Sequence, residues 1–73
     1  MMEALIAQNG TIFSWRNVLY VYERGKDVKA RIAADQDGYC LLATYENADT
    51  RRSVLNMLML AINDGRKTFA FPQ

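Results

Sequence analysis

The chain has 73 residues, enough for one small domain with a modest hydrophobic core. Apolar residues make up 51% of it and charged residues 23%, a balance that argues against intrinsic disorder. Nine basic side chains stand against eight acidic ones, and the net charge of +1 gives no general reason to expect a nucleic acid or an anionic membrane as the main partner.

The first part of the chain predicts a short hairpin. Residues 4–7 are apolar, and the Asn9-Gly10 pair after them is the strongest short hairpin signal, because both residues tolerate the positive φ angles of a type I′ turn. Residues 11–13 then return as a second strand, and residues 15–17 interrupt the strand pattern.

Three longer strands are expected over residues 18–22, 28–34 and 39–45, with turns at residues 25–26 and 35–38. The second of these strands alternates with a period of two, as a strand with one solvated face does. The first is apolar on both faces. Its two predicted sets are Val18, Tyr20 and Tyr22 on one face and Leu19 and Val21 on the other.

The period then changes to that of a helix. Asn47 or Asp49 can cap its first turn, it is expected to run to about Asn63 or Asp64, and Gly65 supplies a left-handed position at its end. Its apolar side chains fill an arc of about 200° on a helical wheel. They are Val54, Leu55, Met57, Leu58, Met59, Ala61 and Ile62, whereas Leu60 falls among the polar residues.

Residues 68–71 predict a last short strand, which Pro72 stops. Because the strands come first and the helix near the end, the sequence predicts one α+β domain over residues 1–73 and not an alternating parallel-sheet protein. We expect an antiparallel β-meander of four to six strands, with the one C-terminal helix packed on one of its faces.

The C-terminal half has a distinctive order of motifs. They are Leu42-Ala43-Thr44-Tyr45, then Glu46-Asn47-Ala48-Asp49-Thr50, a helix with Val54-Leu55 and Leu58, Asp64-Gly65, an aromatic at Phe69 or Phe71, and Pro72. This order resembles small uncharacterised proteins of Gram-positive bacteria and their phages. Those proteins have a β-meander, a leucine-small-x-tyrosine strand, a charged helix and an aromatic-x-x-proline tail. Asn17-Val18 is similar to the start of one of their strands.

The resemblance implies a fold and a phage-related context. It implies little chemistry, because that group of proteins has no assigned activity. The helix of this chain departs from theirs, which tend to be rich in Glu and Lys. It carries Met57, Met59 and Leu60 instead.

The sequence contains no recognisable catalytic or cofactor-binding constellation. Histidine is absent, so the single cysteine, Cys40, has no histidine to activate it. Residues 35–38 are similar to part of a calcium loop, but Ala33 and Thr44 occupy the positions that need a carboxylate and a bidentate glutamate. A glycine-rich phosphate loop is also missing. We therefore expect no enzyme activity, no cofactor and no metal site.

The expected compartment is the cytoplasm. Cys40 cannot form an internal disulfide, and small secreted domains usually need several. The N-terminal residues lack the basic region of a signal peptide. The longest apolar-rich stretch, residues 54–62, is far shorter than the ~20 residues that span a bilayer, so membrane insertion is not expected.

The surplus of apolar side chains predicts an interaction surface. One helix covers only one face of a sheet, and the strand over residues 18–22 is apolar on both faces. The candidate interface residues are Leu19, Val21, Met57, Met59 and Leu60. The leading hypothesis is therefore a small protein-interaction or structural module that acts as a homodimer or binds another protein.

The alternative hypothesis is a nucleic-acid-binding accessory protein of a phage or mobile element. Basic side chains bind phosphates, and an aromatic ring stacks on bases. The candidate contacts are Trp15, Lys29, Arg31, Arg51 and Arg52. Aspartates are interleaved with the basic residues along the chain, so protein contacts remain the first hypothesis and nucleic-acid contacts the second.

Overall fold

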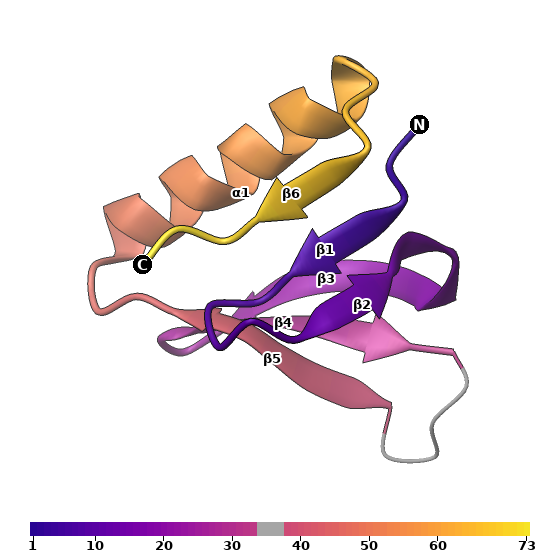
Figure 1. Ribbon diagram of the computed structural model, residues 1–73. Coiled ribbons are helices and arrows are strands. Elements are labelled where there is room, and N and C mark those ends of the chain that lie inside the picture. The colour runs from indigo at the N-terminus through magenta and orange to yellow at the C-terminus, as the bar shows by residue number, and fades with distance from the viewer. Residues whose placement is uncertain (34–37) are drawn as a thin grey trace.

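The structure, a computed structural model, describes residues 1–33 and 38–73 (Figure 1). Within these ranges the elements are β1 (Ala4–Ile6), β2 (Ile12–Ser14), a 3-10 turn (Trp15–Asn17), β3 (Val18–Arg24), β4 (Asp27–Ile32), β5 (Tyr39–Thr44), α1 (Ala48–Asn63) and β6 (Thr68–Ala70). They confirm the α+β class. Of the turn predicted at residues 35–38, residues 35–37 lie outside the described part of the chain.

The described strands form two three-stranded sheets. Sheet A has the order β2-β1-β6. It contains the predicted antiparallel hairpin of β1 and β2, and β6 adds in parallel beside β1 with Phe69 opposite Leu5. The predicted type I′ turn is wrong, because Gly10 has a φ of +90° but Asn9 has no positive φ, and the loop between the strands spans residues 7–11. Sheet B is the antiparallel meander β3-β4-β5. Sheet A thus pairs segments from opposite ends of the described chain, while sheet B pairs neighbours.

The alternation of β3 differs from the prediction because the strand contains an irregularity. Its register against β4 shifts between Val18 and Tyr20, which reverses the face of the residues that follow. Val18 and Val21 therefore both pack against the core, whereas Tyr20 is exposed on the other face. The prediction that Val18 shares a face with Tyr20 is wrong for this reason.

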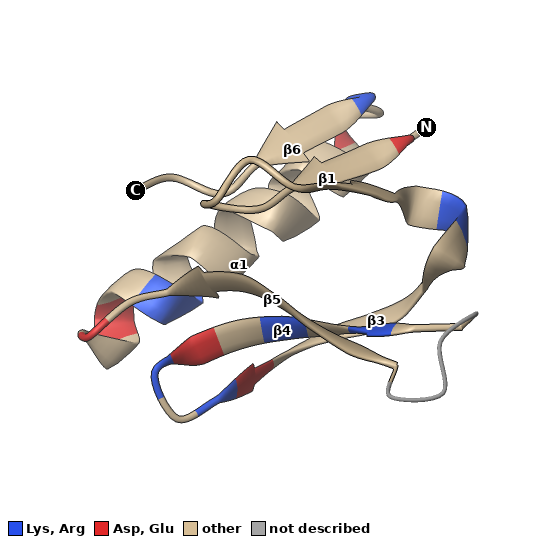
Figure 2. Cartoon of the chain, turned by 60° about the horizontal axis from the view of Figure 1, so that its bottom comes forward, with Lys and Arg blue, Asp and Glu red and all other residues tan. Residues whose placement is uncertain are grey.

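A single hydrophobic cluster fills the space between the two sheets and α1. Its buried members are Met2, Leu5, Ala7, Val28, Ala30, Leu42, Ala43, Tyr45, Val54, Leu58, Ala61 and Phe71. The helix contributes Val54, Leu58 and Ala61, which follow one another at spacings of four and three and so share one face. Sheet A and α1 lie on the same side of sheet B in both views, which leaves the opposite face of sheet B outward (Figure 1, Figure 2).

The ends of α1 agree with the prediction. The side-chain oxygen Oδ1 of Asn47 accepts hydrogen bonds from the backbone N–H groups of Asp49 at 2.7 Å and Thr50 at 3.3 Å, so Asn47 is the N-cap. At the other end Gly65 has a φ of +73°, the left-handed conformation that glycine adopts without strain. No described helix has the length and apolar character required to cross a membrane.

Gln8 joins the two sheets. Its backbone N–H donates to the carbonyl of Leu42 at 2.8 Å, and its side-chain carbonyl accepts from the N–H of Thr44 at 2.9 Å. Its side-chain amide also donates to the carbonyl of Pro72, which accepts a second hydrogen bond from the Tyr45 hydroxyl. The β1–β2 turn, β5 and the C-terminal segment are therefore held at one corner of the molecule.

Candidate binding surfaces

The outward face of sheet B carries an aromatic and cationic surface, which we call the tyrosine face. It consists of Tyr20, Tyr22, Lys29, Arg31, Tyr39 and Leu41. The strand register explains this grouping: on β4, Lys29 lies between Tyr22 and Leu41, and Arg31 lies between Tyr20 and Tyr39. Val28 and Ala30, which alternate with these two cations, are fully buried on the inner face.

The three tyrosine rings of this face contact one another. The ring centroids of Tyr20 and Tyr22 are 5.6 Å apart, and those of Tyr22 and Tyr39 are 6.0 Å apart with an edge-to-face angle of 80°. The Arg31 guanidinium carbon lies 4.7 Å from the centroid of the Tyr39 ring, within cation–π range. Desolvation, followed by the neighbouring Tyr39, raises the pKa of the Tyr20 hydroxyl, which is therefore neutral at physiological pH.

Gly38 makes room for the Arg31 side chain. A Cβ atom at this position would lie 1.9 Å from Nη1 of Arg31, and the φ angle of Gly38 is +58°. Any larger residue would therefore displace the guanidinium from the Tyr39 ring. Glycine at the start of β5 is thus part of how the tyrosine face is built.

The second candidate surface is the free edge of β3, the outermost strand of sheet B on this side. Among the described residues, residues 19–24 form no backbone hydrogen bond with any segment except β4. Leu19 on this strand is 60% exposed. Charge is confined to the end of the strand, at Glu23 and Arg24, and the rest is uncharged (Figure 2). We refer to these backbone groups together with Leu19 as the β3 edge.

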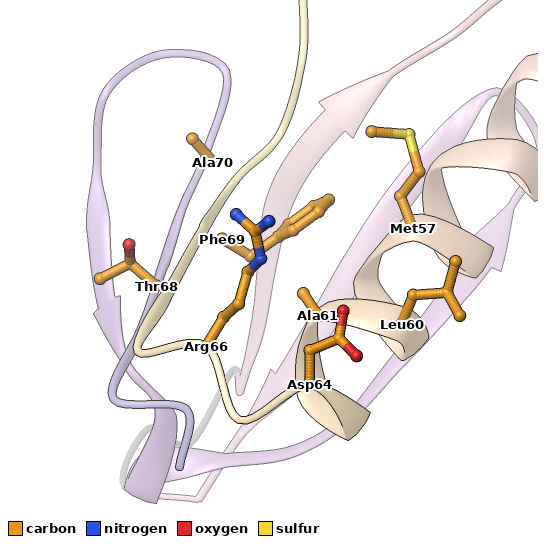
Figure 3. A pocket seen from close by; sticks show the side chains of 8 residues that line it. All are labelled: Met57, Leu60, Ala61, Asp64, Arg66, Thr68, Phe69 and Ala70. Atoms are coloured by element: carbon orange, nitrogen blue, oxygen red, sulfur yellow. The ribbon is translucent and has the colours of Figure 1, made fainter.

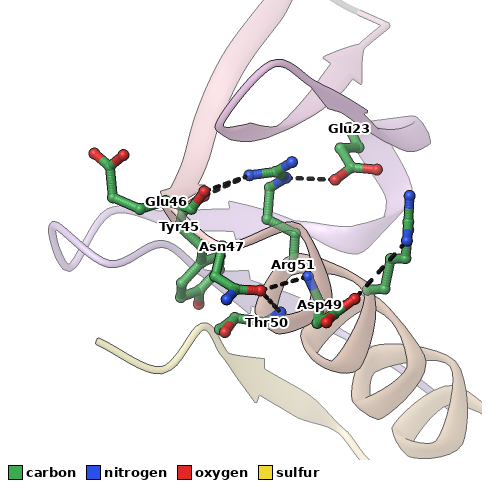
Figure 4. Close-up of polar contacts among 8 residues, drawn as sticks. Glu23, Tyr45, Glu46, Asn47, Asp49, Thr50 and Arg51 are labelled. Atoms are coloured by element: carbon green, nitrogen blue, oxygen red, sulfur yellow. Dashed lines mark hydrogen bonds and ion pairs between the residues drawn. The ribbon is translucent and has the colours of Figure 1, made fainter.

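The helix lies alongside the β3 edge, and Arg51 fixes it there. The Arg51 guanidinium forms an ion pair with Glu23 of β3 and donates to the backbone carbonyls of Tyr45, at 2.7 Å, and Glu46, at 3.3 Å (Figure 4). Its side chain is only 12% exposed. Arg51 is therefore a structural residue that ties the first turn of α1 to sheet B.

The same flank of α1 continues from Arg51 to Leu55 and Met59, since residues four apart lie on one side of a helix. Because β3 and β5 run in the same direction and α1 turns back after β5, the helix runs opposite to β3 (Figure 1). Met59, which is 59% exposed, belongs to this flank in the C-terminal part of α1, where the helix has diverged from sheet B (Figure 1). The ion pair of Arg51 with Glu23 therefore joins α1 to the Glu23 end of β3.

A groove separates the other flank of α1 from β6 (Figure 3). Its volume is about 450 Å³, and it is lined by Met57, Leu60, Ala61, Asp64, Arg66, Thr68, Phe69 and Ala70. In Figure 3 the Phe69 ring and Ala61 lie between strand and helix, and the Arg66 side chain crosses the opening. A second hollow, of about 430 Å³, lies beside Trp15 and the N-terminal residues.

The five predicted interface residues do not form one surface. Leu19 is exposed on β3, and Val21 is half-buried against the core. Met59 is exposed on the Arg51 flank of α1, whereas Met57 and Leu60 are exposed on the opposite flank, where they line the groove beside β6. The structure thus disperses the predicted set over separate places.

The five predicted nucleic-acid contacts are also dispersed. Lys29 and Arg31 share the tyrosine face, but Trp15 is half-buried against the core. Arg51 is engaged by Glu23, and Arg52 is exposed on α1, 3.9 Å from Asp49. Aromatic residues of the tyrosine face, and not Trp15, accompany the cations. Tyr39 and Leu41 are two residues apart in the sequence, as are Lys29 and Arg31. This shared spacing is the signal that could have identified the aromatic residues of the tyrosine face.

The described residues contain no cluster of three or more histidine, cysteine, aspartate or glutamate side chains that could hold a metal ion. Cys40 is half-buried, and its thiol lies 3.6 Å from the carbonyl oxygen of Ala30, to which it donates. Burial raises the pKa of the Cys40 thiol, which disfavours the nucleophilic thiolate. Cys40 is therefore best understood as a packing residue of β5.

No protein-family model matches this sequence, and the chain has no match among the curated proteins or the solved structures. The resemblance to small proteins of Gram-positive bacteria and their phages stays a prediction.

Proposed function

We propose that this protein is a non-catalytic interaction module that assembles as a homodimer by pairing the β3 edges of two copies. The observation that carries the proposal is the β3 edge itself: within the described residues, the backbone of this seven-residue strand pairs on one side only, and its Leu19 side chain is exposed. Such an edge is a template for another strand. The proposal places the protein in a reducing, cytoplasmic compartment.

The composition of β3 favours pairing. Proteins usually protect edge strands with prolines, lysines or inward-pointing charges, or keep them short. β3 has no proline or lysine, and its charged residues, Glu23 and Arg24, stand at its end. By contrast, β6 is three residues long and is flanked by Lys67 and Pro72, which makes it a poor template.

A second copy fits the β3 edge better than a strand of arbitrary sequence. In an antiparallel pair centred on Val21, Glu23 of each copy lies opposite Leu19 of the other, so the two Glu23 carboxylates are at opposite ends. Tyr20 of one copy lies opposite Tyr22 of the other, which extends the aromatic row across the two-fold axis. The exposed Leu19 then becomes part of an interface.

The test is the oligomeric state of the wild type and of surface variants, measured by sedimentation equilibrium from 5 to 200 μM. We expect a dimer for the wild type and a monomer for Leu19→Lys. Leu60→Lys is the matched control, because Leu60 is 53% exposed on the opposite flank of α1. Circular dichroism checks that every variant is folded.

A wild type that stays monomeric at 200 μM contradicts the proposal. So does a dimer that Leu60→Lys disrupts while Leu19→Lys leaves it intact, since that result would place the interface in the groove beside β6.

A further inference from the structure

We propose that the tyrosine face binds single-stranded nucleic acid. This inference goes beyond the homodimer and concerns a different surface, because the tyrosine face is the broad outward side of sheet B and the β3 edge is its margin. Such a site needs flat aromatic rings that stack on the bases and cations that bind the phosphates, and the strand register places both side by side on the tyrosine face.

The rings supply the stacking surface. Tyr20 and Tyr39 are both exposed, and Tyr22 lies between them at 5.6 and 6.0 Å between centroids. Aromatic rings on an open sheet stack on any base, because every base presents a π-face. Arg31, which lies over the Tyr39 ring, adds a planar cation that both stacks and attracts phosphate.

The cations of the tyrosine face favour a nucleic acid over a second copy of the protein as its ligand. Lys29 and Arg31 occupy alternate positions of the central strand, between the aromatic rows of β3 and β5. Two tyrosine faces packed together would bring these like charges toward one another in a desolvated contact, which is costly. An anionic partner with planar rings is complementary to the same arrangement.

The partner is single-stranded because stacking requires accessible bases. In a duplex the bases are already stacked within the helix, and only phosphates and groove edges are presented to a flat sheet. An acidic polypeptide would engage Lys29 and Arg31 but leave the rings unused. A duplex and an acidic polypeptide are therefore the control ligands.

Fluorescence anisotropy of a labelled twelve-nucleotide oligo-dT in 50 mM NaCl tests the proposal. We expect saturable binding. The logarithm of the association constant should fall linearly with the logarithm of the salt concentration, with a slope of about −0.7 for each phosphate contact. Two other ligands are measured for comparison. They are the same oligonucleotide annealed to its complement and a labelled oligoglutamate of twelve residues. Both are expected to bind at least about tenfold more weakly than the single strand.

Four variants assign the binding to the tyrosine face. Tyr39→Ala is expected to weaken binding about fivefold or more, and Tyr39→Phe to retain it, since stacking needs the ring and not the hydroxyl. Lys29→Gln is expected to lower the salt slope by about 0.7. Arg52→Gln is the matched control, because Arg52 is a well-exposed cation on α1, away from this face.

Several results would overturn the inference: no binding at 50 mM NaCl, equal affinity for oligoglutamate or for the duplex, or an Arg52→Gln variant as weak as Tyr39→Ala. Sedimentation of the same samples separates this test from that of the homodimer. A protein that binds oligo-dT as a monomer contradicts only the proposed function, and a dimer that does not bind it contradicts only this inference.

Discussion

The two faces of sheet B differ in how fully their side chains are packed or hydrogen-bonded within the protein. On the inner side, apolar residues pack against α1 and sheet A, and the Arg51 guanidinium has a carboxylate and two carbonyls as partners. On the outer side, Tyr20 and Tyr39 are exposed beside the half-buried cations Lys29 and Arg31, and the β3 edge at its margin pairs with no strand except β4 among the described residues. The inner side therefore accounts for stability, and the outer side is where the free surface for a partner lies.

The largest expected effect compares two leucines of α1 that are two residues apart. Leu58→Ala should lower the free energy of unfolding by about 2–5 kcal/mol, because Leu58 is 4% exposed and its removal leaves a cavity. Leu60→Ala, at 53% exposed, should change it by less than about 0.5 kcal/mol. Urea unfolding followed by circular dichroism measures both. Equal losses would mean that α1 packs through a different face.

The next comparison concerns two neighbouring arginines of the helix. Arg51→Ala should cost about 1–3 kcal/mol, because it leaves the Glu23 carboxylate and two carbonyls without their donor. Arg52→Ala should cost less than about 0.5 kcal/mol, since both partners of its ion pair with Asp49 are well exposed. The same unfolding measurement applies. A large loss for Arg52→Ala would remove the distinction between a structural and a surface cation.

The helix N-cap gives an intermediate effect. Asn47→Ala should destabilise the protein by about 1 kcal/mol, because it removes the oxygen that accepts from the N–H groups of Asp49 and Thr50. Asn56→Ala is the matched control in an exposed, central turn of α1, where alanine is the better helix former and a small stabilisation is expected. If the two variants behave alike, the cap does not contribute to stability.

The smallest expected effect is on the alkaline side of the pH profile. Burial raises the pKa of the Cys40 thiol and of the Tyr45 hydroxyl above their usual values. A group whose folded-state pKa is raised contributes stability that is complete below the unfolded pKa and is lost as pH rises through the folded value. Melting temperature should therefore be flat near neutral pH and fall above about pH 8.5, and further above about pH 10.

Tyr45→Phe separates the two groups. This variant also loses the hydrogen bond to the Pro72 carbonyl, so it should melt lower at neutral pH. Its further loss above pH 10 should be smaller than that of the wild type. An unchanged loss would show that Tyr45 is not responsible for the alkaline instability.

Local patterns predicted the local structure well. The hairpin at Asn9-Gly10, the Asn47 cap and the Gly65 terminus of α1 each depend on a few adjacent residues, and the sequence identifies them because the physical cause is itself local. The type of the turn was not identified, since Gly10 alone of the pair has a positive φ. The α+β class follows from the order of strand and helix periods.

Long-range features escaped prediction. The parallel pairing of β1 with β6 joins residues more than sixty positions apart, and no local signal specifies it. The shift in β3 between Val18 and Tyr20 reversed the predicted faces, because one extra residue inverts a period of two. The tyrosine face was missed for a related reason: its members come from three strands and meet only once the register is known.

The pairing of β1 with β6 also has a consequence for how this fold is acquired during translation. Leu5 is synthesised before the other described strands but receives its neighbour Phe69 only after all of the other described elements have been synthesised. Closing so long a loop costs conformational entropy that local contacts do not repay in advance. The nascent polypeptide should therefore stay incompletely folded until residues 68–71 are available, and then fold in one cooperative step.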